Sequence, residues 1–489
     1  MNMSMSRRAF MASAAALGAA SVILPASARA ASEKRLIVGK RTIEVNGKPA
    51  SVFGLTGPNG DPSVVLAADE MFDLTLENRS GVATIIHWHG QLPPPELDGV
   101  TDTGYAVPLE DGETRPYRFA ARPGTHWMHS HQGLQEQQLL AAPLIVRTAA
   151  DLKSDLQEVV VLLHDFSFRD PVEILNGLTG GSTMGQESDA GGMGMAMPMD
   201  MSGMAMPMTP SKKAQSPMIM GGMDLNDIEF DAYLANDRTL DDPLVVRTDR
   251  NGRVRLRIIN GATSTAFWID LGGALATLVA VDGNDVVPIS ASRFSLAQAQ
   301  RIDLIVDVGA GEVVPVLAQR EGDRPRTGII LAAPGVQVNK LSGVADTASA
   351  ALNLDQEAGL MASVPLSTRS ADVRHAVMLT GSMMPYQWSM DDQTWATHRK
   401  LEVSKGQRVE IEFMNHSMMA HPMHLHGHHF QIVEIAGRRI AGAIRDTVLV
   451  PPMTSVVVAF DADNPGRWLY HCHNLYHMAT GMMAELIYL

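Results

Sequence analysis

The 489-residue chain is poor in cysteine, in aromatic side chains and in positive charge. Its only cysteine, Cys472, excludes an intrachain disulfide and is therefore a buried core residue, a reactive thiol or a metal ligand. The net charge of −14 argues against nucleic acid or an anionic membrane as a partner, because both bind basic surfaces. The remaining composition is that of a globular protein long enough for about three domains.

A long hydrophobic run is also missing. The apolar stretch from Met11 to Leu24 has 14 residues, whereas a membrane-spanning helix needs about 20. Arg7 and Arg8 precede this stretch and small residues follow it, which predicts a signal peptide over residues 1–30. The sequence S-R-R-A-F favours the twin-arginine translocase over the general secretory route, which is the alternative. We therefore expect an exported, periplasmic protein without a membrane span.

Short runs of alternating apolar and polar residues take the place of long helical periodicity in the body of the chain. Such runs cover residues 72–77, 254–258 and 409–413. A period of two is typical of half-buried antiparallel strands. The sequence therefore predicts an all-β protein, most simply one built of β-sandwiches.

These runs belong to an internal repeat. An asparagine and a turn follow each run, and nine residues beyond Asn78, Asn260 and Asn415 the chain reaches His87, Ile269 and His424, respectively. We infer three copies of one β-domain, of which the middle copy lacks the histidines. A single large barrel is the alternative, and the repeated landmarks disfavour it. The expected domain bounds are 31–148, 149–334 and 371–489, with a linker over 335–370.

Histidines recur as H-x-H pairs in the first and third copies. The four pairs that stand at matching places are His87/His89, His129/His131, His424/His426 and His471/His473. Residues i and i+2 of a strand point to the same face, so each pair offers two neighbouring imidazoles, and pairs from two domains can converge on one metal cluster. Imidazole binds copper, zinc, iron and nickel, so the pairs alone leave the element open.

The stretch His471-Cys472-His473 narrows the choice of metal. Strand alternation places Cys472 on the face opposite to both histidines, so the cysteine belongs to a different site. Its expected partners are His421, His477 and Met482. Two histidines, a thiolate and a weak axial methionine are the ligand set of a blue-copper electron-transfer centre.

Four motifs in this order resemble those of the multicopper oxidases, the family of laccases and bacterial cuprous oxidases. They are HWHG at 87–90, HWMHSH at 126–131, HPMHLHG at 421–427 and HCHNLYHMATGM at 471–482. The resemblance implies three cupredoxin-like Greek-key β-sandwich domains and four copper ions. It also implies an enzyme that oxidises a small reductant one electron at a time and reduces dioxygen to water.

The resemblance assigns a role to each matching residue. The type 1 copper would take His421, Cys472, His477 and axial Met482; the type 2 copper His87 and His424; one type 3 ion His89, His129 and His473, and the other His131, His426 and His471. Asp98 matches an acidic residue that assists proton delivery in the family, although a solvated turn aspartate is the alternative reading. Bacterial relatives often have Glu after the histidine that matches His477, whereas this chain has Met478. This chain therefore lacks the carboxylate that those relatives have at this position.

Twelve of the 31 methionines lie between Met184 and Met223, among Gly, Pro and Ser. Such a segment cannot form a packed core, and thioether sulfur favours Cu(I). We hypothesise that this insertion, 184–223, gathers Cu(I) and that the enzyme serves copper tolerance by oxidising Cu(I) and/or phenols and aromatic amines. A neutral insertion or an oxidant sink is the alternative for the segment.

For the whole protein, the alternative functions are a laccase-like phenol oxidase without a role in copper homeostasis and a non-enzymatic periplasmic copper-binding protein. We expect a monomer.

Deletion of Met193 to Met223 tests the hypothesis for the insertion. If the methionines collect Cu(I), the deletion lowers Cu(I) turnover and leaves the turnover of a bulky phenol unchanged, because soft sulfur ligands do not bind a phenol. Steady-state kinetics with both reductants on the same preparation measure this difference. Equal loss of both activities, or loss of neither, contradicts the hypothesis.

Overall fold

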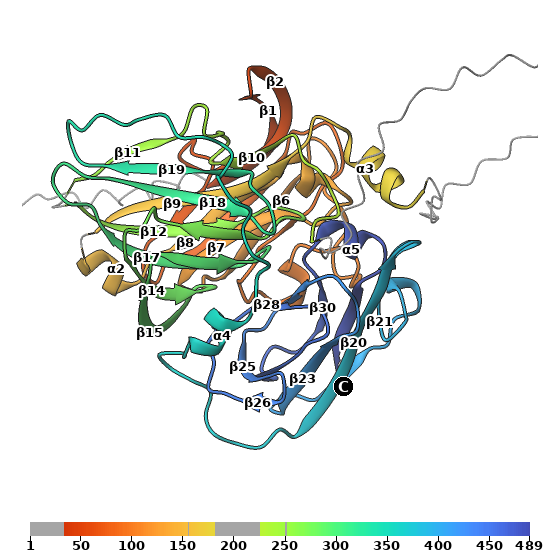
Figure 1. Ribbon diagram of the computed structural model, residues 1–489. Helices are drawn as coiled ribbons and strands as arrows, with labels where there is room; N and C mark the ends of the chain where they lie inside the picture. Colours follow the sequence, from red (N-terminus) through yellow and green to blue (C-terminus); the bar gives the residue numbers. More distant parts are fainter. Residues whose placement is uncertain (1–33, 155, 181–224, 250–251) are drawn as a thin grey trace, which may run out of the picture.

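The computed structural model describes residues 34–154, 156–180, 225–249 and 252–489, and these form an all-β fold of three sandwiches (Figure 1). The predicted signal peptide and the methionine-rich insertion lie outside the described residues. Within the described ranges, no helix is both long and apolar enough to cross a bilayer. The three sandwiches confirm the prediction of an all-β protein with three cupredoxin-like domains. The exact residue bounds of the domains stay a prediction.

The first domain consists of two four-stranded sheets. One sheet has the order β2 (Lys48–Thr56), β1 (Arg35–Val45), β4 (Met71–Asn78) and β6 (Thr114–Ala120). The other has the order β3 (Val64–Leu66), β8 (Ala141–Val146), β7 (Gly124–Ser130) and β5 (Ile86–His87). Two 3-10 turns, η1 (Pro95–Leu97) and η2 (Gln135–Gln138), and the short helix α2 (Ala149–Ser154) complete it.

The second domain has larger sheets. The six-stranded sheet runs β10 (Ala232–Ala235), β9 (Gln157–Phe166), β12 (Arg253–Asn260), β17 (Arg301–Asp307), β14 (Ala276–Val281) and β15 (Asn284–Ala291). The five-stranded sheet runs β11 (Val245–Arg247), β19 (Arg326–Ala332), β18 (Val313–Arg320), β13 (Phe267–Asp270) and β16 (Arg293–Leu296). Helix α3 (Pro171–Leu178) follows β9, and α4 (Asp355–Gly359) lies in the predicted linker.

The third domain contains the C-terminal strands. One sheet runs β21 (Tyr386–Met390), β20 (Val373–Met383), β23 (Arg408–Asn415), β29 (Ser455–Asp461), β25 (Phe430–Ile435) and β26 (Arg438–Arg439), with β27 (Ile444–Arg445) also on β25. The other runs β22 (Leu401–Val403), β31 (Met483–Tyr488), β30 (Arg467–Cys472), β24 (His421–Leu425) and β28 (Thr447–Val450). The turn η4 (Trp395–Thr397) and helix α5 (Leu475–Ala479) connect these strands.

Strand pairing repeats the same topology in all three domains. The first long strand pairs in parallel with an inner strand as β1 with β4, β9 with β12 and β20 with β23. In the opposite sheet the parallel pairs are β3 with β8, β11 with β19 and β22 with β31. The internal repeat seen in the sequence therefore corresponds to three copies of one architecture.

The repeated asparagines have the same structural task in each copy. Asn78, Asn260 and Asn415 are fully buried, and each side-chain amide donates to two main-chain carbonyls, one in the turn that follows and one in a segment more than 30 residues further along the chain. Each side-chain oxygen also accepts from the main-chain N–H two residues later. Because buried polar groups need partners, this residue fixes the turn that follows it, which in the first and third copies leads to the first H-x-H pair.

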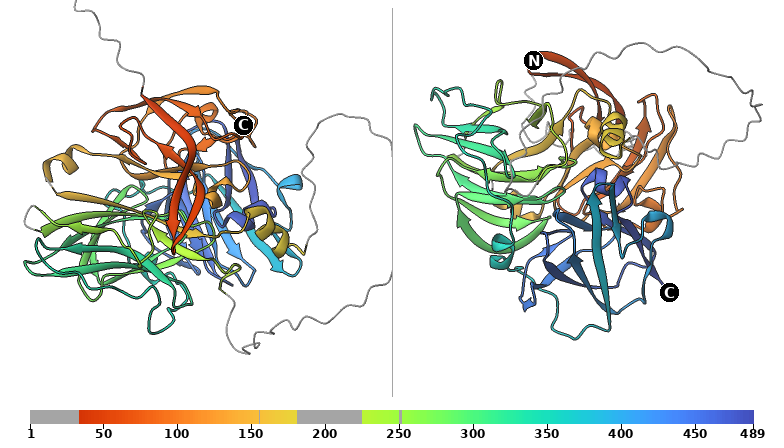
Figure 2. Two further views of the ribbon diagram at one scale, coloured as in Figure 1. Left: turned by 90° about the horizontal axis from the view of Figure 1, so that it is seen from above. Right: turned by 45° about the vertical axis from the view of Figure 1, so that its right-hand side comes forward.

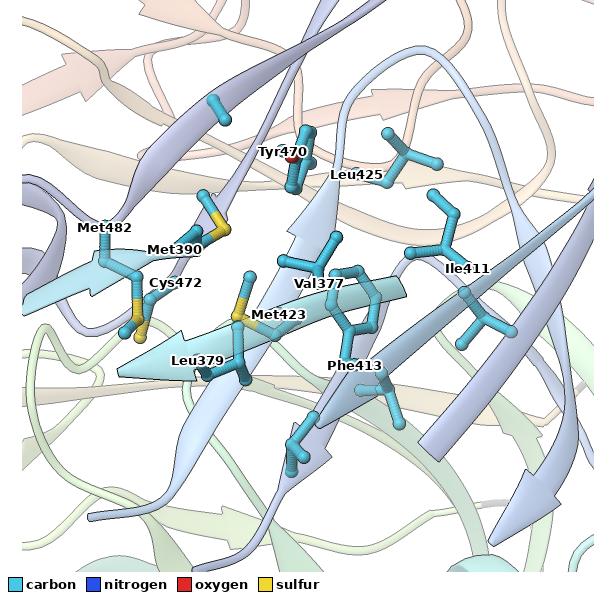
Figure 3. Close-up of a cluster of buried hydrophobic side chains, with 14 of the residues drawn as sticks. Val377, Leu379, Met390, Ile411, Phe413, Met423, Leu425, Tyr470, Cys472 and Met482 are labelled. Carbon is cyan, nitrogen blue, oxygen red and sulfur yellow. The ribbon is translucent and has the colours of Figure 1, made fainter. Parts of the chain in front are cut away.

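Each domain has its own hydrophobic core, and the third packs against the other two (Figures 1 and 2). In the third domain, Phe413, Met423 and Tyr470 belong to a core that ends at the side chains of Cys472 and Met482 (Figure 3). The cysteine is thus held at the end of a packed apolar region, where water is excluded.

Candidate metal centres

Eight imidazoles from the four H-x-H pairs converge where the first and third domains meet. Each of the eight is at most 8% exposed. Rings from the two domains are in direct contact: His89 stacks on His424 with centroids 3.8 Å apart, and His87 lies 4.0 Å from His426. The structure therefore brings together all the residues that the resemblance assigns to the type 2 and type 3 ions.

Every ring in this group turns one nitrogen toward the others. Six of these nitrogens are buried and have no hydrogen-bond partner among the described residues: Nε2 of His87, His129, His131, His424 and His473, and Nδ1 of His89. The remaining two rings, His426 and His471, face each other with their Nε2 atoms 3.0 Å apart. Buried polar atoms are rarely left without a partner, so this convergence of lone pairs fits bound metal ions.

Donor atoms group in threes, of which one is an expected type 3 set and another joins the two expected type 2 ligands to a type 3 ligand. His131, His426 and His471, the residues assigned to one type 3 ion, present nitrogens that all lie within 4.8 Å of one another. The same holds for His87, His424 and His426. The assignment of each imidazole to a particular ion stays a prediction.

Carboxylates and main-chain oxygens hold the opposite ring nitrogens. Nδ1 of His426 donates to Asp98 Oδ2 at 2.8 Å, and Nδ1 of His87 donates to the Asp98 carbonyl oxygen at 2.9 Å. Nδ1 of His471 donates to the carbonyl of Cys472 at 3.0 Å. A proton fixed on the outer nitrogen leaves the inner nitrogen with a free lone pair, which is the tautomer that a metal requires.

Burial keeps these rings neutral. It lowers the pKa of His471 to about 3, and it lowers the pKa of His89, His131, His424, His426 and His473 well below the ordinary value. Desolvation is the largest cause in each case, because a buried imidazolium loses its hydration. Neutral imidazoles are the form that binds metals.

A second group forms around Cys472, on the other side of its strand. Sγ of Cys472 lies 3.6 Å from Nδ1 of His421 and 3.6 Å from Nδ1 of His477, and the two Nδ1 atoms are 3.1 Å apart. Their outer Nε2 atoms are held by Ser417 Oγ at 2.8 Å and Asp227 Oδ2 at 2.8 Å. Both lone pairs therefore face the sulfur.

Met482 completes this second group. Its side chain is fully buried beside Cys472, and its carbonyl oxygen accepts the Cys472 N–H at 3.1 Å (Figure 3). Burial raises the pKa of the Cys472 thiol, so a bound cation is required to stabilise the thiolate. Two imidazoles, one sulfur and a neighbouring thioether fit copper better than a hard cation.

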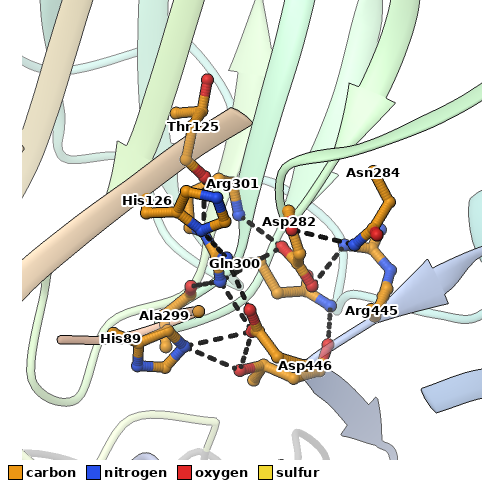
Figure 4. A network of polar contacts seen from close by, with 12 residues as sticks. His89, Thr125, His126, Asp282, Asn284, Ala299, Gln300, Arg301, Arg445 and Asp446 are labelled. Atoms are coloured by element: carbon orange, nitrogen blue, oxygen red, sulfur yellow. Dashed lines mark hydrogen bonds and ion pairs between the residues drawn. The ribbon is translucent and has the colours of Figure 1, made fainter. Parts of the chain in front are cut away.

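Several residues at these centres belong to none of the sequence motifs. Asp446 lies between the two domains: its Oδ1 accepts from Nε2 of His89 at 3.1 Å, and its carbonyl accepts from Nδ1 of His424 at 2.8 Å (Figure 4). Arg301 of the second domain donates to both oxygens of Asp446 at 2.7 and 2.6 Å. Burial would raise the pKa of Asp446, but Arg301 holds it well below its ordinary value.

Glu136 and Asp227 were also not predicted from the sequence, because neither belongs to a motif. Three histidines without an assigned role lie near the cluster: His126 and His428 are buried, and His429 is half-buried. Their partners are protein groups: His126 accepts from Arg301, His428 contacts the Tyr488 hydroxyl, and His429 bonds to Gly90 O. These contacts connect the three histidines to the surrounding protein.

Cupredoxin-like sandwiches with these two buried centres define a copper oxidoreductase, and comparison with known proteins agrees. Sequence models of the family described as "Multicopper oxidase" match residues 37–151, 205–313 and 368–489. Multicopper oxidase MmcO of Mycobacterium tuberculosis is 30% identical over 457 residues, which cover 90% of this chain and 84% of that protein. A Copper resistance protein A homolog of Pseudomonas syringae pv. tomato is 26% identical to this chain, over 92% of this chain and 91% of that protein.

The chain therefore belongs to the multicopper oxidase family, and it is an oxygen-dependent copper oxidoreductase of the laccase and copper-oxidase type. Solved structures agree on the fold. Fet3p, a multicopper oxidase that functions in iron import, superposes with a TM-score of 0.71 at 17% identity over 93% of this chain and 90% of its own. Laccase from Botrytis aclada has a TM-score of 0.71 at 21% identity, over 93% and 87% of the two chains.

The buried neutral histidines predict acid sensitivity of the copper-free protein. Above pH about 6.5 these histidines are neutral in both the folded and the unfolded state. Below that pH the histidines of the unfolded chain take up protons, whereas the buried rings stay unprotonated because their pKa is lowered. The free energy of unfolding should therefore decrease as the pH is lowered, by about 1.4 kcal/mol per pH unit for each such ring. Denaturant unfolding at pH 7.5, 6.5 and 5.5 measures the slope. A stability that does not change between pH 6.5 and 5.5 contradicts this account.

Proposed function

We propose that the protein binds four copper ions and oxidises Cu(I), phenols or aromatic amines while it reduces dioxygen to water. One ion would be held by His421, Cys472, His477 and Met482, and three by the eight imidazoles of the H-x-H pairs. The main support for the proposal is that consecutive residues at the end of β30 belong to two different groups of donor atoms. Cys472 faces one pair of imidazoles at 3.6 Å, while its neighbours His471 and His473 belong to the other group.

Copper, when bound, supplies one-electron redox chemistry and the reduction of dioxygen. The chain supplies the path between the two centres, because a single peptide unit joins Cys472 to each flanking histidine. It also excludes water, since every proposed ligand is at most 8% exposed. Low polarity strengthens each electrostatic interaction at such a site.

Asp98 is proposed to hold ligands and to supply protons. It is 2% exposed, and it binds His87 through its carbonyl and His426 through Oδ2. Its Oδ1 lies 3.4 Å from Nδ1 of His87 and has no hydrogen bond among the described residues. A solvated turn aspartate does not fit this burial, so the contacts support a role at the cluster.

Asp227 is proposed to connect the reductant to the type 1 centre. Its Oδ2 accepts from His477 at 2.8 Å and from the Tyr386 hydroxyl at 2.6 Å, while Oδ1 has no hydrogen-bond partner among the described residues. Burial would raise the pKa of Asp227, but His477 and Tyr386 lower it overall. A negative charge on the outer edge of His477 favours a cationic reductant such as Cu(I).

A role in copper tolerance and export to the periplasm complete the proposal. Proteins named Copper resistance protein A, from Pseudomonas syringae pv. tomato and Escherichia coli, are 26% identical to this chain over 92% of its length. The paired arginines at the N-terminus and the methionine-rich insertion support the same assignment.

Side-by-side kinetics with Cu(I), Fe(II) and a phenol test the function on the copper-loaded protein. We expect a blue protein that consumes oxygen and has its highest kcat/KM with Cu(I). Asp227→Asn should lower kcat/KM for Cu(I) by about 10-fold or more, because one charge a few ångströms from the reductant is worth more than about 1.4 kcal/mol. The same variant should affect the phenol less, which serves as the internal control.

A blue protein that consumes no oxygen contradicts the proposed function. Fe(II) as the best reductant contradicts the choice of Cu(I). Equal losses for Cu(I) and the phenol in Asp227→Asn contradict the electrostatic role of Asp227 and leave it a general part of the electron path.

A further inference from the structure

We infer that Glu136 is a positioning residue for the copper cluster: its carboxylate stands behind His129 and His473, two ligands proposed for the same type 3 ion. The inference rests on the proposed four-copper function. Glu136 lies outside all four motifs, on the 3-10 turn η2 of the first domain, and is 3% exposed.

The two carboxylate oxygens face two different imidazoles. Oε2 lies 3.0 Å from Nδ1 of His129, whose proton also faces the carbonyl oxygen of Ser130 at 3.1 Å. Oε1 lies 3.9 Å from Nδ1 of His473, and it is buried without a hydrogen-bond partner among the described residues. The carboxylate is therefore aimed at the rear of both rings, whose Nε2 atoms point into the cluster.

The residues on either side hold Glu136 in this place. Gln135 accepts from Thr84 Oγ1 at 2.7 Å and from Ser130 Oγ at 2.8 Å, and it donates to the Ala83 carbonyl. Gln137 accepts from the Thr263 hydroxyl of the second domain at 2.6 Å and from the Tyr476 hydroxyl of the third at 3.2 Å. A turn tied to three domains leaves the carboxylate little freedom to move, which is the requirement for preorganising a metal ligand.

Among the described residues that line a small cavity on this side of the cluster, Glu136 is the only acid; Asp102 Oδ2 lies 3.8 Å from Nδ1 of His131, outside that lining. The cavity is lined by His129, His131, Glu136, His471, Cys472, His473, Leu475 and Met478. Met478 contributes an apolar side chain to this lining. Asp98 and Asp446 also hold two rings each, with a carboxylate oxygen for one ring (His426 and His89) and the main-chain carbonyl for the other (His87 and His424).

A carboxylate behind a ligating imidazole fixes the ring and makes its inner nitrogen a stronger donor. Loss of such a partner lowers metal affinity by about 10- to 100-fold. Two variants separate the charge of Glu136 from its hydrogen-bond acceptors. Glu136→Gln keeps the shape of the side chain but removes the charge, and Glu136→Leu removes both the charge and the hydrogen-bond acceptors.

Copper binding is the readout. Chelator-competition titration gives the affinity of the three-ion cluster, and the near-ultraviolet absorbance of the type 3 pair reports its assembly. The blue absorbance of the Cys472 centre and the melting temperature of the copper-free protein show that each variant is folded. Glu96→Gln is the matched control, because Glu96 is an exposed acid on η1 of the same domain.

We expect both Glu136 variants to lose cluster affinity by about 10-fold or more and to lose type 3 absorbance, while the blue absorbance persists and Glu96→Gln behaves as the wild type. Wild-type affinity in both variants overturns the inference. Loss in Glu136→Leu alone shows that a neutral hydrogen-bond acceptor is sufficient, and this overturns the role of the carboxylate. Absence of type 3 absorbance in the wild type overturns the proposed function together with the inference, so the two failures are distinguishable.

Discussion

A buried ion pair between Arg301 and Asp446 joins the three domains at the metal cluster. Both side chains are at most 1% exposed, and the guanidinium binds both carboxylate oxygens. Asp446 in turn holds His89 of the first domain and His424 of the third (Figure 4). Removing one member of such a pair leaves an uncompensated buried charge, which costs about 3–5 kcal/mol. The second domain, which has no ligand in the described residues, thus contributes the cation that keeps this carboxylate ionised.

The ion pair is one of several acidic contacts around the eight buried imidazoles. Asp98, Glu136 and Asp446 stand on the outer side of the cluster, and the inner side presents only lone pairs. Bringing so many lone pairs together in an apolar interior is unfavourable unless cations bind between them. The linker contributes through Glu357, which binds Arg445, the neighbour of Asp446, with both oxygens at 2.9 Å. Folding and metal binding are therefore linked.

Sequence reasoning found the features that local patterns encode. The period of two and the asparagine landmarks predicted the threefold repeat, and strand alternation separated Cys472 from His471 and His473. Arg301, Asp446, Glu136 and Asp227 were not predictable, because each is a single charged residue without neighbours of a recognisable pattern. Only the fold brings Arg301 within 2.7 Å of Asp446, 145 residues away. Signals for ligands are thus local, whereas signals for the groups that hold them depend on tertiary structure.

Anomalous X-ray scattering at the copper edge from crystals of the copper-loaded protein tests the central claim most directly. The account predicts four copper positions. One lies within bonding distance of Cys472 Sγ and the Nδ1 atoms of His421 and His477, and three lie among the inward nitrogens of the H-x-H pairs, with His89 bound through Nδ1. Copper at Cys472 alone, or a ring such as His89 bound through the nitrogen that faces Asp446, would contradict it.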